Sequence, residues 1–171
     1  MSETSEVIDQ AKAEFIRSTD NLKAILAATP DDKINWSPSV TSRTPLQVAA
    51  HAALWISRMQ GIVSSNLYQT PFERIADSIA VKEGASIYAA MRALEEPYTT
   101  REQVLDLLET SSAAYLAFLD GIAPETVGTT VNLGHGLFPL AVAIRFNAVH
   151  IESHVAQIEY IQTIYGDHDW H

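Results

Sequence analysis

Apolar residues recur every three or four positions in four long stretches of the chain, which is the spacing of one face of an α-helix. These stretches cover about residues 3–28, 45–66, 99–120 and 138–165. No convincing set of strands accompanies them, although residues 129–133 have some extended character. The pattern therefore predicts an all-α fold, a four-helix bundle.

Capping signals mark where two of these helices begin. Thr44 and Gln47 have the spacing of a capping box, and Pro45 suits the first helical position. Thr99 and Glu102 have the same spacing and predict the start of the third helix.

Each predicted helix has an inward stripe of apolar residues, with charged residues off it. The stripes comprise Ile8, Ala11, Phe15, Leu22 and Leu26 in the first helix, Val48, His51, Leu54, Trp55, Met59 and Ile62 in the second, and Val104, Leu105, Leu108, Tyr115 and Leu119 in the third. Ser18 and Thr19 interrupt the first stripe, and we expect their hydroxyls to bond to carbonyls of their own helix.

The connection from Leu67 to Tyr98 has the weakest pattern. Residues 85–96 predict a short helix ended by Pro97. So long a connection fits a crossover between the second and third helices, and it could cover the end of a pocket.

Composition narrows the class of protein. With 171 residues the chain is expected to form one domain, residues 1–171, with a single core. The formal charge of −10 argues against a nucleic-acid surface and against an anionic membrane. The absence of cysteine excludes disulfides, thiolate ligands and a cysteine nucleophile.

Neither targeting nor membrane insertion is indicated. The acidic N-terminus lacks the apolar core of a signal peptide, and the most apolar run, residues 137–149, is too short for a span. We expect a cytoplasmic protein.

Three histidines lie on these inward faces. His150 and His154 are four residues apart and therefore lie on one side of the fourth helix, while His51 lies on the apolar face of the second. If the two helices are neighbours, the imidazoles can converge on one divalent ion, and three nitrogen ligands with an open position suit zinc, nickel or iron(II). The alternative is core histidines, each bonded to a neighbour. His135 between two glycines and His168 and His171 in the tail are expected to be solvated.

Other metal chemistries fit the residues less well. A zinc-protease helix would read His-Glu-x-x-His, whereas Glu152 lies one place later and roughly opposite the histidine side. A di-iron bundle needs inward glutamates, which the stripes lack. Nothing marks the nucleophile elbow of a serine hydrolase.

Several features together resemble the DinB/YfiT-like metal-binding bundles. They are Trp36-Ser37-Pro38 ahead of a capped helix, the start at Thr44 followed by His51, and the late His150-Ile151-Glu152-Ser153-His154. The resemblance implies a bundle with a long crossover, a divalent metal on His51, His150 and His154, and often a homodimer. It also implies metal-dependent hydrolases or S-transferases that act with small-molecule thiols.

The leading functional hypothesis is a metal-dependent enzyme, of transferase or hydrolase type, acting on a small molecule. The alternatives are a ligand-binding or stress-response bundle and a purely structural ion. Arg58, on nearly the same line as His51, is a candidate for binding an anionic substrate group, although its stem could instead lie along the core. Gln157 and Asn147, each about one turn from a histidine, either orient a ligand or serve in packing.

Overall fold

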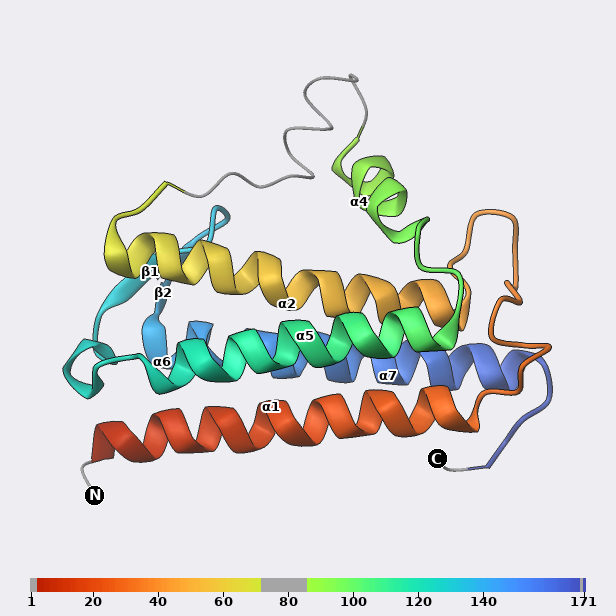
Figure 1. Ribbon diagram of the computed structural model, residues 1–171, viewed down its shortest axis with the longest axis horizontal. Coiled ribbons are helices and arrows are strands. Elements are labelled where there is room, and N and C mark those ends of the chain that lie inside the picture. Colours follow the sequence, from red (N-terminus) through yellow and green to blue (C-terminus); the bar gives the residue numbers. More distant parts are fainter. Residues whose placement is uncertain (1–2, 72–85, 170) are drawn as a thin grey trace.

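Four long helices lie side by side along one axis in the computed structural model, which describes residues 3–71, 86–169 and 171 (Figure 1). They are α1 (Glu3–Ala28), α2 (Pro45–Tyr68), α5 (Arg101–Asp120) and α7 (Phe146–Ile164). In cross-section α2 contacts α5 and α7, and α1 contacts the same two helices from the other side. The predicted all-α four-helix bundle is confirmed.

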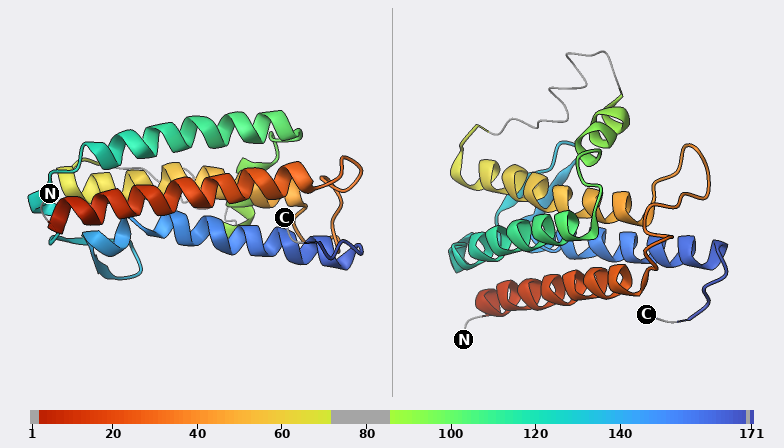
Figure 2. Two further views of the ribbon diagram at one scale, coloured as in Figure 1. Left: turned by 90° about the horizontal axis from the view of Figure 1, so that it is seen from below. Right: turned by 45° about the vertical axis from the view of Figure 1, so that its right-hand side comes forward.

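The direction of the helices explains the crossover. Figure 1 shows α2 and α5 running the same way, so the chain must return along the bundle between them. Part of this return is α4 (Ile87–Glu95), which lies over the first half of α2 and packs against it (Figures 1 and 2). The predicted short helix and crossover are thus confirmed, while residues 72–85 lie outside the described part of the chain.

Local hydrogen bonds set the start of α2 as predicted. The Thr44 hydroxyl accepts from the backbone N–H of Gln47 at 3.2 Å, and the Gln47 side chain accepts from the backbone N–H of Thr44 at 3.1 Å. The helix continues slightly past the predicted end, to Tyr68, and stops where Gln69 adopts a left-handed conformation with φ of 54°.

The predicted cap of α5 is wrong by one residue. Thr100, not Thr99, is the N-cap, and its capping-box partner is Gln103 rather than Glu102. Both pairs have the spacing of a capping box, so the spacing cannot choose between them. In the structure the Gln103 side chain accepts from the backbone N–H groups of both Thr99 and Thr100, at 2.8 and 3.0 Å, which places the helix start after Thr100.

The fourth predicted helix is interrupted. Its expected beginning, residues 138 and 139, lies in β2 (Leu137–Pro139), which is followed by the short helix α6 (Leu140–Ala143). The partner of β2 is β1 (Thr130–Asn132), in the segment 129–133 whose predicted extended character is confirmed. A short 3-10 helix, Pro124–Thr126, precedes the hairpin. Between α6 and α7 the carbonyl of Ile144 accepts a hydrogen bond from the buried Tyr115 hydroxyl of α5. At this break a side chain from another helix therefore hydrogen-bonds to the backbone carbonyl. The periodicity of apolar residues within one segment cannot reveal such a contact between helices.

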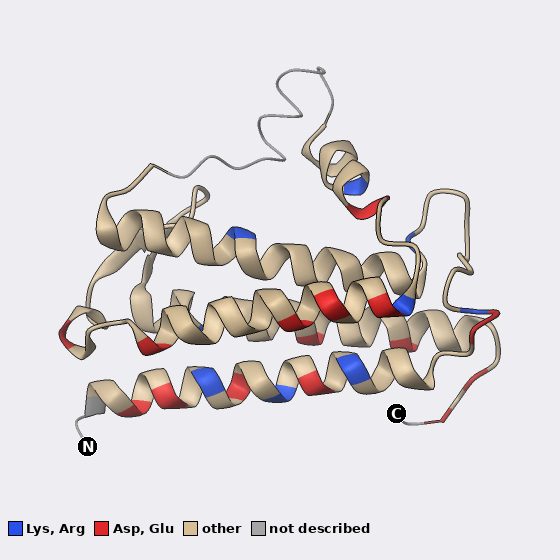
Figure 3. Ribbon diagram, viewed as in Figure 1, with Lys and Arg blue, Asp and Glu red and all other residues tan. Residues whose placement is uncertain are grey.

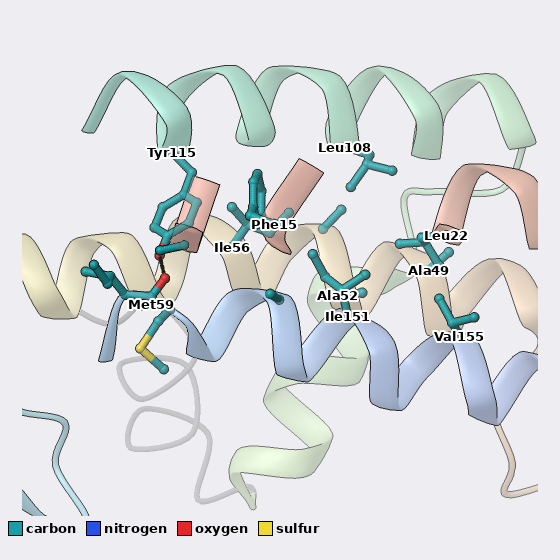
Figure 4. Close-up of a cluster of buried hydrophobic side chains, with 14 of the residues drawn as sticks. Phe15, Leu22, Ala49, Ala52, Ile56, Met59, Leu108, Tyr115, Ile151 and Val155 are labelled. Carbon is teal, nitrogen blue, oxygen red and sulfur yellow. Dashed lines mark hydrogen bonds between the residues drawn. The ribbon is translucent and has the colours of Figure 1, made fainter. Parts of the chain in front are cut away.

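The core lies between the four long helices, where the predicted stripes of α1 and α5 meet (Figure 4). Phe15 and Tyr115 pack edge to face with ring centroids 4.8 Å apart. The predicted hydroxyl bonds also occur, from Ser18 to the Glu14 carbonyl at 3.0 Å and from Thr19 to the Ile16 carbonyl at 2.8 Å. On α2 a group of alanines is fully buried, and small side chains let neighbouring helices approach closely: Ala49, Ala50, Ala52 and Ala53.

Charged side chains are spread over the outside of the bundle, most densely on α1 (Figure 3). Some tie elements together: Arg145 forms two bonds of 2.7 Å with Glu14, which joins the start of α7 to α1. Among the helices in the described part of the chain, none has the length and apolar character required to cross a membrane.

Candidate metal centre

The three candidate histidines converge between α2 and α7. His51 is in the second turn of α2, and His150 and His154 lie one turn apart on the adjoining face of α7. Their ring centroids are 5.4 Å apart for His51 and His150, 5.0 Å for His51 and His154, and 4.4 Å for the α7 pair. One nitrogen from each ring can be chosen so that all three lie within 4.8 Å of one another. The structure thus forms a cluster that could hold a metal ion.

The spacing within the α7 pair suits a shared cation. The Nε2 atoms of His150 and His154 are 3.2 Å apart. Two nitrogens that each lie about 2.05 Å from a tetrahedral zinc ion are separated by about 3.4 Å. The donor set and its spacing therefore fit a divalent ion bound by imidazole.

The histidines are not a closed hydrogen-bonded group. Nδ1 of His154 lies 3.0 Å from the Gln157 side-chain oxygen. Nδ1 of His150 is buried, yet no described residue makes a hydrogen bond to it. The Trp55 ring stacks on His150 instead, with centroids 4.7 Å apart. A hydrogen bond between the two Nε2 atoms, 3.2 Å apart, can satisfy the other nitrogen of His150, so the alternative of core histidines leaves only Nδ1 of this ring without a partner.

Burial keeps the α7 pair neutral. Desolvation, reinforced by the charges of His154, His51 and Arg43, lowers the pKa of His150 to about 3. Desolvation likewise lowers the pKa of His154 to about 4, although the hydrogen bond with Gln157 opposes the shift. A metal ligand must be an unprotonated imidazole, so near neutral pH both rings are in the form that binds an ion.

A buried carboxylate, Glu95 at the end of α4, adjoins the cluster. Its side chain is 1% exposed, and Oε1 lies 2.9 Å from Nδ1 of His51. Arg43 donates two hydrogen bonds to the same carboxylate, from Nε to Oε2 at 2.8 Å and from Nη2 to Oε1 at 2.7 Å. Burial alone would raise the pKa of Glu95, but the hydrogen bonds from His51 and Arg43 outweigh burial and hold the pKa below its ordinary value. The acid is therefore ionised and paired.

Sequence reasoning missed Glu95 and Arg43. A weak signal existed, since Glu95 follows Met91 by four residues, and both are buried on the same face of α4. The pairing could not be found from periodicity, because it joins α4 to residues about 44 and 52 positions earlier, in and before α2.

The other candidates lie outside the histidine cluster. Arg58 is half-buried with its guanidinium 5.5 Å from the Trp55 ring centroid and Nη1 3.8 Å from the Met91 sulfur. Asn147 is fully buried and donates to the Ile56 carbonyl at 3.4 Å, which favours the packing alternative. His135 is exposed beside Phe138, as expected of a turn, and His168 and His171 are exposed in the tail.

An all-α bundle with an imidazole cluster between its second and fourth long helices defines a class of candidate metal-binding proteins. The DinB superfamily matches residues 14–158 of this sequence, which includes all three histidines. The chain therefore belongs to the DinB superfamily. Among curated proteins, no sequence matches this chain.

Solved structures agree with this fold. The sibling lethal factor precursor DfsB is similar with a TM-score of 0.69 and 16% identity, covering 94% of this chain and 97% of its own. An uncharacterized protein from Clostridium difficile 630 is similar with a TM-score of 0.65 and 11% identity, covering 92% and 96%. A conserved protein from Enterococcus faecalis also gives 0.65, with 15% identity and coverage of 98% and 99%. At these identities the likeness concerns the fold alone.

Proposed function

We propose that the protein binds one divalent ion through His51, His150 and His154 and acts as a metal-dependent enzyme on a small molecule. The observation that carries this proposal is the convergence of three imidazoles from α2 and α7, two of them held neutral by burial. Within the described residues, the cluster contains no fourth histidine, aspartate or glutamate ligand, which favours an open coordination position over a closed structural site.

A divalent ion in this position would act as a Lewis acid that lowers the pKa of a bound water or thiol. The side chains of the protein supply the surroundings. Gln157 accepts from Nδ1 of His154 and so leaves Nε2 of that ring free to bind. Trp55 covers one face of His150 and keeps water from it.

Between the two reaction types, thiol transfer fits the described residues better than hydrolysis. A hydrolase normally uses a general base to deprotonate the attacking water. Glu95 is the carboxylate nearest to the histidines among the contacts described above, but it is already engaged by Arg43 and His51. A metal-bound thiol needs no additional base, because the ion itself favours the thiolate. We therefore propose a thiol S-transferase type of activity.

Arg58 is proposed to bind an anionic group of the substrate. Its guanidinium lies against the Trp55 ring, which in turn stacks on His150, so one aromatic ring links the arginine to the cluster. Replacing Arg58 by methionine should raise the KM for an anionic substrate and leave metal affinity unchanged. A parallel loss of metal affinity would mean that Arg58 supports the fold of the site instead.

We also propose a homodimer, as the family resemblance implies. Two large side chains on one face of α7 support it, since Val149 and Tyr160 are 62% and 68% exposed. They are eleven residues apart, about three helical turns, and so lie on the same side of the helix.

The metal proposal is tested with untagged protein by competition against a chromophoric zinc chelator. We expect about one ion per chain and a sharp loss of affinity in His51→Ala, His150→Ala and His154→Ala. The matched control is His135→Ala, which removes an exposed histidine and should bind like the unmodified protein. Equal affinity in His51→Ala would remove α2 from the site and refute the three-histidine assignment.

A further inference from the structure

We propose that Glu95 is a positioning residue that fixes His51 for metal binding and thereby links α4 to the occupancy of the metal site. This inference rests on the proposed metal site and concerns a residue outside the ligand set. It explains why a glutamate with 1% exposure lies at the end of a helix that is otherwise peripheral to the bundle.

The contact with Glu95 determines the tautomer of His51. A carboxylate only accepts hydrogen bonds, so the 2.9 Å contact with Glu95 requires the proton of His51 to lie on Nδ1. Nε2 then carries the free lone pair. Carboxylates that hold metal-binding histidines in this way orient the ring and make it a better ligand.

Glu95 is itself held in place. Arg43 donates two hydrogen bonds to it, in the planar fork that matches a carboxylate. Arg43 is only 11% exposed, and its guanidinium also lies 5.0 Å from the centroid of the Tyr88 ring at the other end of α4. Arg43 therefore holds both carboxylate oxygens, including the Oε1 atom that His51 also contacts, and the buried charge of Glu95 is compensated.

Binding of an ion should also stabilise the docking of α4 on α2. Among the described elements, α4 packs mainly on α2, and its buried residues are Ala90, Met91 and Glu95. If Glu95 raises the affinity of the site for an ion, the bound ion must stabilise the docking of Glu95 by the same factor. The segment that covers the first half of α2 should therefore become more protected when the ion binds (Figure 1).

The variant that tests this is Glu95→Gln, which keeps the size of the side chain but removes its charge. A glutamine can donate to Nδ1 of His51 and so permit the wrong tautomer. We expect zinc affinity to fall about 10- to 100-fold, the range usual for such partners of metal ligands. Glu96→Gln, which removes an exposed charge from the adjacent position, should bind zinc like the unmodified protein.

A merely structural role for Glu95 gives a different result. In that case Glu95→Gln would lower thermal stability with no change in zinc affinity, and the proposal would be overturned. If Glu95 acts by positioning His51, then adding Glu95→Gln to the His51→Ala variant should cause no further loss of zinc affinity. If Glu95→Gln lowered zinc affinity as much in the His51→Ala variant as in the unmodified protein, Glu95 would not act through His51.

Hydrogen exchange of the unmodified protein tests the link to α4 without any variant. Zinc should slow amide exchange across α4 more than across α5, and unchanged exchange in α4 would contradict the coupling. If the unmodified protein binds no divalent ion at all, the proposed function fails. If it binds an ion and Glu95→Gln binds equally well, only the role of Glu95 fails.

Discussion

At the scale of single residues, burial determines the acid–base behaviour of His150 and His154. Their pKa values in the folded protein are about 3 and about 4, whereas the same imidazoles in an unfolded chain should titrate near their ordinary pKa of 6.5. Between these values the unfolded state binds more protons than the folded state. Stability of the metal-free protein should therefore fall as pH decreases below about 6.5.

The expected slope is at most about 1.4 kcal/mol per pH unit for each of the two histidines. Urea unfolding of metal-free protein between pH 7.5 and 5 measures it. His150→Leu should make the slope shallower, while His135→Ala, which removes an exposed histidine, should not. A slope that is unchanged by His150→Leu would show that other groups cause the acid sensitivity.

The sequence allowed the histidine cluster to be predicted, but not the partners of its side chains. The positions of His51, His150 and His154 on inward faces follow from helical periodicity, because the stripe of each helix can be read within that helix. Glu95 and Arg43 meet only after the crossover folds back on α2. Pairings of this kind depend on tertiary structure, which residue spacing in one helix does not contain.

At the scale of elements, a one-residue shift separates the predicted and observed caps of α5. Thr100→Ala should cost about 1 kcal/mol of stability, because it removes the side-chain oxygen that accepts from the Gln103 backbone N–H. Thr99→Ala is the matched control and should cost much less, since it removes only an exposed contact of 3.3 Å. Chemical denaturation measures the free energy of unfolding of both variants. A larger loss of stability in Thr99→Ala than in Thr100→Ala would support the predicted cap at Thr99 instead.

The bounds of the long helices were largely predictable, and the interruption of the last one was not. The predicted span of α1 agrees with the structure because its stripe and its stop signal lie in the same segment. The break before α7 instead involves the hydroxyl of Tyr115, 29 residues earlier in the chain. The hairpin that precedes it also depends on pairing between residues of two short strands.

At the scale of the whole molecule, the proposed homodimer gives a direct prediction. Light scattering at micromolar concentration should yield about twice the chain mass of 18.8 kDa. Val149→Lys should shift the mass toward the monomer, because it replaces one of the exposed apolar side chains of α7 with a charge. Val40→Lys, at a fully exposed loop position, is the control and should remain dimeric. A monomer mass for the unmodified protein would reject the dimer and leave the metal site unaffected.

The central claim is an open metal site formed by three histidines, and cobalt(II) tests it most directly. The protein is loaded with cobalt(II), and its visible spectrum is recorded while a small thiol or azide is added. An open position predicts a saturable change in the spectrum, which should be absent in His150→Ala and retained in His135→Ala. A cobalt spectrum that forms but does not respond to either added ligand would mean a closed structural ion, and it would contradict the proposed catalytic role.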